Sequence, residues 1–319
     1  LNLGGIYQDL GQLDNALVLT LKSLELKCNN ADAHMNLGRI YYEQALYDLS
    51  HQSFFKAWRL EPHRLDRYIA AHMNSCSIYA DDEDIKKYRK NLFDIIAKIK
   101  KDKKLIFEDT PLPLPSSLFQ LAYQNKADDR LLLERLADAL LNNKTVQKCL
   151  VSKKTGKPSK MGRKKIRIAI ISDYLGNHAV GHHFNSLINF LLDSDMEVKV
   201  FSRTPPREHT QAPEETTKIP YTQLPASISA SCTIVKNYNA DMVLFTEIGM
   251  SAHTLTLALA RMAPIQALIA GHPCTSGMKS IDYFVSSELV ECPGNQQFYT
   301  EQLVLLTTFP STMKFPSLP

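Results

Sequence analysis

Several features that would place a protein in a specialised class are missing from this sequence of 319 residues. No apolar run approaches the ~18 residues that a membrane-spanning helix needs, and the first residues do not form a signal peptide. The six cysteines are scattered, with no Cys-x-x-Cys pair, which argues against a structural zinc site or a disulfide framework. The formal net charge of +4 is small for this length, so composition does not indicate a nucleic-acid partner. We therefore expect a cytoplasmic protein that binds neither membrane nor nucleic acid.

Common catalytic signatures are also absent. The sequence has no Gly-x-Ser-x-Gly nucleophile elbow, and the loop in which a dinucleotide fingerprint would fall lacks Gly-x-Gly-x-x-Gly. His178 and His182 are one helical turn apart, and His272 could complete a set of three zinc ligands. Their segment reads His-Ala-Val-Gly-His, however, without the glutamate of zinc hydrolases, and Gly181 disfavours a helix there. A metal-dependent hydrolase is the weaker alternative, and we expect no metal.

The amino-terminal residues contain a repeat. The pattern Asn-Leu-Gly, followed three residues later by Tyr, occurs at 2–7 and again 34 residues on at 36–41, which is the tetratricopeptide period. Ala57 and Pro62 fall where that pattern places a small residue and a closing proline, whereas Ser50 replaces an alanine. We predict tetratricopeptide repeats over 1–62, with further repeats preceding Leu1, and a helical connector over 63–150.

Three shorter segments support this organisation. The acidic run 81–84 suits the start of a helix better than a metal site, because carboxylates complement the helix dipole. Residues 118–141 have a helical period. Residues 151–165 are rich in lysine and arginine without an aromatic for base stacking, and we interpret them as a basic interdomain linker.

From Ile166 onward, short apolar runs alternate with helical segments. We predict strands at 166–171, 197–201, 241–245, 265–270, 281–285 and near 303, helices at 184–192, 227–238 and 254–262, and a long surface loop over 203–224. Alternation of this kind predicts a right-handed parallel α/β sheet. The fold class is therefore α+α/β, with helical repeats followed by a parallel α/β lobe over 166–319.

Three polar loops follow predicted strands of this sheet. They carry Asp173, His178 and His182 in the first loop, Glu247 in the second, and His272, Thr275 and Ser276 in the third. Ligands of open parallel sheets bind outside the carboxyl ends of the strands. We therefore expect these sequence-distant groups to converge on one functional site.

The chain resembles the protein O-GlcNAc transferase family, in its bacterial form with Glu-Ile-Gly-Met at 247–250. The resemblance rests on the repeats and on five segments: Arg-Ile-Ala-Ile-Ile-Ser-Asp-Tyr-Leu-Gly-Asn-His-Ala-Val-Gly-His, Leu-Ala-Arg-Met-Ala-Pro-Ile-Gln, Gly-His-Pro-Cys-Thr-Ser-Gly, Ile-Asp-Tyr-Phe and Tyr-Thr-Glu-Gln-Leu. It implies an inverting glycosyltransferase that moves N-acetylglucosamine, or another hexose, from a UDP-sugar to protein side chains without a metal. It also implies that 166–319 form the Rossmann-like amino-terminal lobe of a GT-B fold, and that the donor-binding lobe lies outside this sequence.

The resemblance also suggests site residues. His178 and His182 match the two histidines of the family's active-site segment, with Ala179 standing where many members have proline, and Thr275 and Ser276 match a loop that faces the site. His272 stands where many members have tyrosine. We predict His178 and Glu247 as catalytic, and His182, His272, Thr275 and Ser276 as substrate-binding. An imidazole, with an ordinary pKa of ~6.5, suits proton transfer near neutrality.

Two functions from different classes remain open. The first is a protein glycosyltransferase whose repeats bind the polypeptide acceptor, with this stretch inactive by itself because it lacks the donor lobe. The second is a repeat scaffold for protein interactions, fused to an inactive transferase-like lobe.

Overall fold

The computed structural model describes residues 2–9, 11–74, 79–113, 116–126, 128–150, 165–176, 178–203, 219 and 221–309. Within these ranges the chain forms two compact units. The helical unit comprises residues 1–108 and 112–124, and the sheet unit comprises 109–111 and 125–319. The predicted connector 63–150 is thus divided, since residues 125–150 fold with the sheet. Except for Lys165, the predicted basic linker 151–165 lies outside the described residues, as do 310–319.

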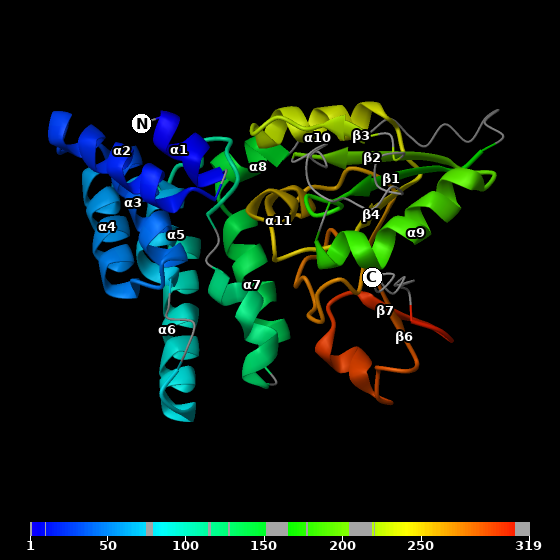
Figure 1. The fold of residues 1–319 in the computed structure, drawn as a ribbon. Coiled ribbons are helices and arrows are strands. Elements are labelled where there is room, and N and C mark those ends of the chain that lie inside the picture. The colour runs from blue at the N-terminus through cyan, green and yellow to red at the C-terminus, as the bar shows by residue number, and fades with distance from the viewer. Residues whose placement is uncertain are drawn as a thin grey trace, which may run out of the picture. The chain divides into compact units, whose positions relative to one another are not determined.

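The helical unit consists of consecutive helices, coloured blue to cyan in Figure 1. They are α1 (Asn2–Asp9), α2 (Leu13–Leu26), α3 (Ala31–Glu43), α4 (Tyr47–Leu60), α5 (Leu65–Met73), α6 (Asp82–Lys101) and the 3₁₀ helix η1 (Ser116–Gln124). The first four form two helix–turn–helix pairs over the segment in which the 34-residue period was found. The acidic run at 81–84 begins α6: Asp81 caps the helix by accepting a hydrogen bond from the Asp84 amide at 2.9 Å. The prediction of a capping segment is confirmed.

Helices α3 and α4 pack through small residues. A Cβ placed on Gly38 would lie 2.6 Å from the ring of Phe54, so the ring sits directly on the glycine backbone. The hydroxyl of Ser50 donates to the carbonyl of the same glycine at 2.8 Å. Ser50, where the predicted repeat pattern has alanine, therefore adds a buried hydrogen bond at the helix contact. Ala57 completes this core and is fully buried.

The segment 118–141, in which a helical period was found, is helical but forms two elements. Residues 116–124 form η1, and a separate helix α7 runs over Asp129–Leu141. Asn125 lies between them with a left-handed backbone (φ 52°), a conformation that a helix cannot continue through and that asparagine tolerates. The helical spacing of apolar residues continues across Asn125, so the sequence pattern does not reveal the end of η1 and the start of α7.

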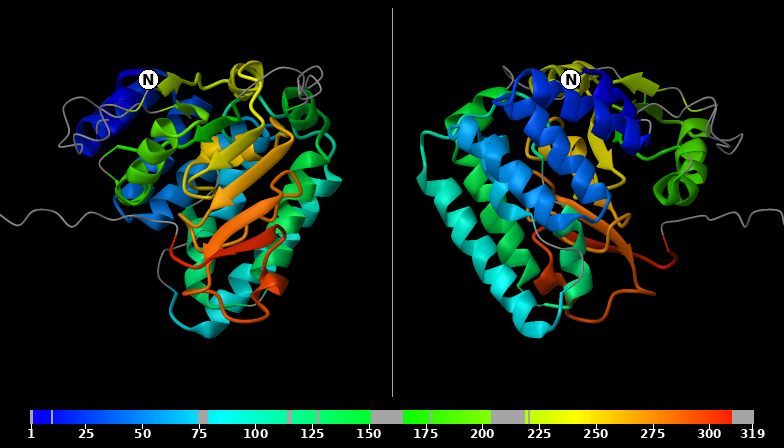
Figure 2. Two further views of the ribbon diagram at one scale, coloured as in Figure 1. Left: turned by 90° about the vertical axis from the view of Figure 1, so that its right-hand side faces the viewer. Right: turned by 60° about the vertical axis from the view of Figure 1, so that its left-hand side comes forward.

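Among its described residues, the sheet unit has seven parallel strands, which run side by side in Figures 1 and 2. They are β1 (Arg167–Ile171), β2 (Glu197–Ser202), β3 (Tyr221–Gln223), β4 (Met242–Phe245), β5 (Ile265–Ile269), β6 (Tyr283–Ser287) and β7 (Gln302–Leu306). Their order is β3-β2-β1-β4-β5-β6-β7, and every described pair is parallel. The predicted parallel α/β sheet is confirmed.

Helices of the sheet unit are α7, α8 (Lys144–Leu150), α9 (Ala179–Asp193), α10 (Ile228–Asn237), α11 (Ala252–Ala258) and the 3₁₀ helix η3 (Asn295–Phe298). The core on one face joins β1 to α9, with Ile168 and Ile170 packed against Phe184 and Ile188. Alternate residues of β1 are buried as well, so both faces of the strand are covered, as expected for a parallel sheet. No described helix has the length and apolar character of a membrane span.

Two predictions in this unit need correction. Strand β3 falls inside the predicted surface loop 203–224; it is a short edge strand of Tyr-Thr-Gln whose first and last residues are exposed, so its sequence carries no apolar run. Residues 204–218 of that loop lie outside the described residues. The helix predicted at 254–262 instead begins at Ala252, because the hydroxyl of Ser251 accepts hydrogen bonds from the amides of His253 and Thr254.

The close packing on Gly38 gives a stability prediction. Gly38→Ala should lower the free energy of unfolding of the helical unit by about 1–3 kcal/mol, because the new methyl group overlaps the Phe54 ring. The matched control is Gly5→Ala in α1, where a Cβ meets nothing within 4 Å and where alanine should be favourable by up to ~1 kcal/mol. Urea unfolding followed by fluorescence of Trp58, the single tryptophan, reports this unit. Equal effects of the two substitutions would contradict the packing described here.

Candidate functional site

Three loops leave the carboxyl ends of neighbouring strands. Strands β1, β4 and β5 are adjacent and parallel, and the loops that follow them begin at Ser172, Thr246 and Ala270. The loops are in close contact: a Cβ on Gly271 would lie 2.1 Å from the carbonyl oxygen of Thr246 and 3.2 Å from the ring of Phe184. Only glycine fits at this point. The predicted placement of the His178 loop and the 271–277 loop on one edge of the sheet is confirmed.

Glu247 joins the loop after β4 to the loop after β1. Its carboxyl group accepts hydrogen bonds from the Ser172 hydroxyl at 2.8 Å, from the Asp173 amide at 2.8 Å and from the hydroxyl of Thr246. The side chain has no exposed surface. Burial raises the pKa of Glu247 to about 8, against the opposing effect of these hydrogen bonds. We predicted Glu247 as catalytic, but here its carboxyl group contacts its own chain and holds the β1 loop in place.

Asp173 links the β1 loop to the residues after β2 and to the start of α11. Its carboxylate accepts from the Ser251 hydroxyl at 2.6 Å and from the Arg203 amide at 2.9 Å, and it lies 3.4 Å from Nδ1 of His253. Burial alone would raise the pKa of Asp173, but the nearby His253 imidazole and the hydrogen bonds from Ser251 and the Arg203 amide lower it below its usual value. The sequence interpretation did not include His253, since only the fold brings α11 against the β1 loop.

These residues also form a chain that resembles a catalytic triad. Nε2 of His253 lies 3.4 Å from the hydroxyl of Ser231, and its Nδ1 faces Asp173. Ser231 is fully buried and donates to the carbonyl of Pro225 at 2.8 Å. A nucleophile must reach its substrate, so this arrangement stabilises the fold and does not form a hydrolase site.

His178 lies at the start of α9, where the β1 loop ends. Its Nδ1 accepts a hydrogen bond from the Val180 amide at 3.2 Å, so the imidazole is the N-cap of the helix. The ring packs against Tyr174, with centroids 4.5 Å apart and planes inclined by 31°. Burial, together with the charge of neighbouring His182, lowers the pKa of His178. Because Nδ1 accepts, the neutral ring carries its proton on Nε2 and presents an N–H donor.

The helix that His178 caps includes Gly181, contrary to our prediction that this glycine disfavours a helix. A Cβ on Gly181 would lie 2.4 Å from the carbonyl oxygen of Gly176 and 2.6 Å from that of Leu175. The glycine is thus required because the β1 loop folds back onto the first turn of α9. His182 lies in the same turn with its side chain exposed. No group of three metal-ligating side chains occurs among the described residues, and His178, His182 and His272 do not come together as a ligand set.

In the third loop, His272 is buried next to Gly249. A Cβ on that glycine, whose φ is 98°, would lie 3.7 Å from the imidazole. Burial lowers the pKa of His272 to about 4. The ring is therefore neutral at physiological pH, and it lies beside the β4 loop.

Thr275 and Ser276 are hydrogen-bonded to Glu301, which the sequence analysis did not include among the site residues. The hydroxyl of Thr275 donates to Glu301 at 2.7 Å, and the amide and hydroxyl of Ser276 both donate to the other oxygen of that carboxylate. Glu301 is buried beside β7. The only sequence signal for it was its place in the Tyr-Thr-Glu-Gln-Leu segment. These contacts use both hydroxyls to fix the shape of the loop.

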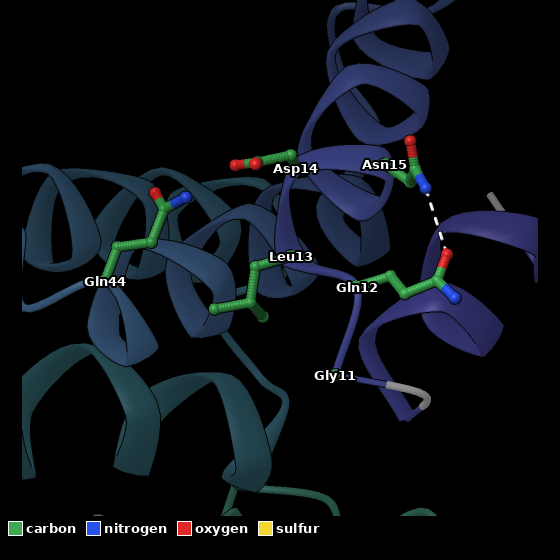
Figure 3. Close-up of a pocket in the computed structure, with 6 residues that line it drawn as sticks. All are labelled: Gly11, Gln12, Leu13, Asp14, Asn15 and Gln44. Atoms are coloured by element: carbon green, nitrogen blue, oxygen red, sulfur yellow. Dashed lines mark hydrogen bonds between the residues drawn. The ribbon is translucent and has the colours of Figure 1, made fainter.

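A separate polar pocket lies in the helical unit, at the turn between α1 and α2. It is lined by Gly11, Gln12, Leu13, Asp14, Asn15 and Gln44 (Figure 3). The amide of Asn15 donates to Gln12 at 3.0 Å on one side, while the side chains of Asp14 and Gln44 point into the space beside Leu13. Carboxylate and amide groups of this kind can bond to the main chain of an extended peptide.

Comparison with known proteins identifies a family for this chain. The model described as glycosyl transferase family 41 matches residues 84–312. A probable UDP-N-acetylglucosamine–peptide N-acetylglucosaminyltransferase SEC of Arabidopsis thaliana is 28% identical over 149 residues, which are 46% of this chain and 15% of that protein. The solved structure of a mutant of Thermobaculum terrenum O-GlcNAc transferase superposes with a TM-score of 0.65 at 17% identity, covering 98% of this chain and 58% of the other. The chain thus spans little more than half of the solved relative, and the match to the curated relative covers a much smaller part.

The buried carboxyl group of Glu247 predicts how stability depends on pH. Its pKa in the folded protein, about 8, lies above the ordinary value of 4.5, so the folded state binds the extra proton. Stability from this group is complete below the ordinary pKa and is lost as the pH rises through about 8. Between pH 7 and pH 8 the sheet unit should lose on the order of 1 kcal/mol.

Glu247→Gln should remove this loss, because glutamine does not titrate. Urea unfolding at the two pH values, followed by far-ultraviolet circular dichroism, measures it. Glu288→Gln, at an exposed position, is the matched control and should keep the pH dependence of the unmodified protein. A Glu247→Gln variant with the same pH dependence as that control would show that Glu247 is already ionised in the fold.

Proposed function

Because the chain belongs to glycosyl transferase family 41, we propose that the protein transfers N-acetylglucosamine, or another hexose, from a UDP-sugar to side chains of other proteins, with inversion at the anomeric carbon. The observation that carries this proposal is the position of His178 at the carboxyl edge of the sheet, among three loops that pack on one another. The names of the two relatives, a peptide N-acetylglucosaminyltransferase and an O-GlcNAc transferase, agree with the proposed sugar and acceptor class.

His178 is the group we assign to the reacting atoms. Inverting transfer needs an acceptor oxygen or nitrogen held in line with the anomeric carbon. With Nδ1 occupied by the Val180 amide, Nε2–H of the neutral ring has no hydrogen-bond partner among the described residues. We assign it to donate a hydrogen bond to a substrate oxygen. Acting as a base would require the other tautomer, which gives up the N-cap, so donation is the better use of this ring.

The other predicted site residues have more indirect roles in this proposal. His182 is exposed one helical turn further on and suits a contact with the substrate. His272, Thr275 and Ser276 shape the third loop through burial and through Glu301, and a substrate would meet the loop at its backbone. The chemistry needs no metal, and the UDP-sugar is a co-substrate.

The polypeptide acceptor belongs, in this proposal, to the helical unit. Its helix pairs carry the tetratricopeptide period, and the pocket at Asp14 and Gln44 offers hydrogen-bonding groups for a peptide main chain. The same pocket favours the second candidate function, a scaffold that binds proteins without transferring sugar. Release of UDP in the presence of acceptor protein and the complete gene product separates the two, because a scaffold releases none.

Substitution of His178 tests its assignment. In the complete protein, His178→Ala should lower kcat by roughly 10²-fold or more, which is the usual scale for a lost preorganised donor. Affinity for the UDP-sugar should change little, since the ring is assigned to the reacting atoms. His63→Ala, at an exposed turn of the helical unit, is the matched histidine control. Turnover by the His178 variant equal to that of the control would remove this histidine from the mechanism.

Residues 1–319 alone should transfer no sugar. Stabilisation of a departing diphosphate needs several preorganised donors, and we assign these to a donor lobe outside this stretch. Calorimetric titration should show weak or no binding of UDP-N-acetylglucosamine, while acceptor peptide still binds. Sugar transfer by residues 1–319 would overturn this division of labour, and loss of peptide binding would move the acceptor site elsewhere.

A further inference from the structure

Tyr174 connects two of the loops that form the candidate site. Its ring belongs to the loop after β1 and packs against the imidazole of His178, with the centroids 4.5 Å apart. Its hydroxyl donates to the carbonyl of Met250, in the loop after β4, at 3.2 Å. Tyr174 therefore links the loop after β4, through Met250, to the imidazole of His178.

The hydroxyl keeps its donor proton over a wide pH range. Burial, with the carboxyl groups of Glu247 and Asp173 nearby, raises the pKa of Tyr174 above its ordinary value. The backbone on either side of the phenol is also held. The backbone amide of Tyr174 donates to the Ser172 hydroxyl at 3.2 Å, and the carbonyl of Leu175 accepts from the side-chain amide (Nδ2) of Asn185 in α9 at 3.1 Å. The tyrosine is thus a rigid support.

Two restraints then act on the imidazole of His178. The Val180 amide, bonded to Nδ1, fixes the direction of the ring within its plane. The phenol ring fixes the plane itself, since the two rings are inclined by only 31°. With both in place, the direction of Nε2–H is determined. Without the phenol, the imidazole could turn about its hydrogen bond to Val180.

We infer that Tyr174 is a positioning residue for His178: its ring sets the plane of the imidazole, and its bond to Met250 locks that ring to the neighbouring loop. This inference rests on the proposed transferase function for its kinetic consequence, but the positioning itself can be measured without turnover. Misplacement of a reacting group by about 1 Å can lower a rate by up to ~10².

The experiment uses Tyr174→Leu, which removes the aromatic face and the hydroxyl, and Tyr174→Phe, which removes only the hydroxyl. In the complete protein, Tyr174→Leu should lower kcat at least tenfold with KM for donor and acceptor within about twofold. Tyr174→Phe keeps the aromatic face and loses only the bond to Met250, so it should lower kcat less than Tyr174→Leu does. The imidazole of His178 should titrate at higher pH in the leucine variant, because burial is the main cause of its lowered pKa. Nuclear magnetic resonance of histidine-labelled protein measures this titration.

Tyr238 provides the matched control. It is likewise half-buried, and its hydroxyl donates to a backbone carbonyl, that of Glu197, at 2.8 Å. This contact lies at the amino-terminal end of β2, at the opposite end of the strands from the candidate site. Tyr238→Leu should cost stability and leave both kcat and the titration of His178 unchanged.

The outcomes distinguish this inference from the proposed function. If the unmodified protein transfers no sugar but Tyr174→Leu alone shifts the His178 titration, the transferase proposal fails and the positioning role stands. If the unmodified protein is active and Tyr174→Leu matches Tyr238→Leu in kcat and in titration, the positioning role is overturned. If Tyr174→Leu does not fold, Tyr174→Phe provides the test. The inference requires His178 to titrate in this variant at the same pH as in the unmodified protein. A His178 pKa raised to that of a fully exposed histidine would contradict the inference.

Discussion

The carboxyl group of Glu247 lies between two adjacent parallel strand ends, away from water. A buried carboxyl group is costly unless its oxygens are hydrogen-bonded, and here the donors are a hydroxyl and an amide of the β1 loop and the hydroxyl of Thr246. The loops after β1 and β4, whose bonded residues Asp173 and Glu247 are 74 residues apart in the chain, are thereby fixed next to each other. The position of the β1 loop depends on this bridge, because it fixes where that loop begins.

The remaining course of that loop is set by close backbone approaches. Gly181 lets the carbonyl groups of Leu175 and Gly176 rest on the first turn of α9, and Gly271 lets the third loop rest on Thr246. Neither position has room for a methyl group. Asp173 and Tyr174 of this loop are also hydrogen-bonded to the loop that follows β4, through Ser251 and Met250. At this end of the sheet the loops are therefore packed on one another, and His178 lies where the β1 loop meets α9.

The sequence predicted the parts of this arrangement that depend on local patterns. Strands such as β1 and β5 are short apolar runs because they are covered on both faces, and the rule that ligands bind at strand carboxyl ends brought the correct loops together. It did not predict β3, whose three residues carry no apolar pattern, or the break at Asn125, where a single backbone angle interrupts a helical period. Roles within the site were hardest, because the partners of Glu247 and Thr275 lie 75 and 26 residues away and only the fold shows them.

The residue after His178 shows how such contacts can replace a covalent constraint. The family resemblance suggests proline at this position, where the chain has Ala179, the first residue of α9. A proline there would fix φ and preorganise the helix start without the loss of a needed hydrogen bond. With alanine, the same backbone is held by the bond from Val180 to Nδ1, by the amide of His178 donating to Gly176 at 2.8 Å, and by the fit of Gly181. The rigidity of the segment then depends on the imidazole remaining in one tautomer, which couples the stability of the helix start to the protonation state that the proposed chemistry uses.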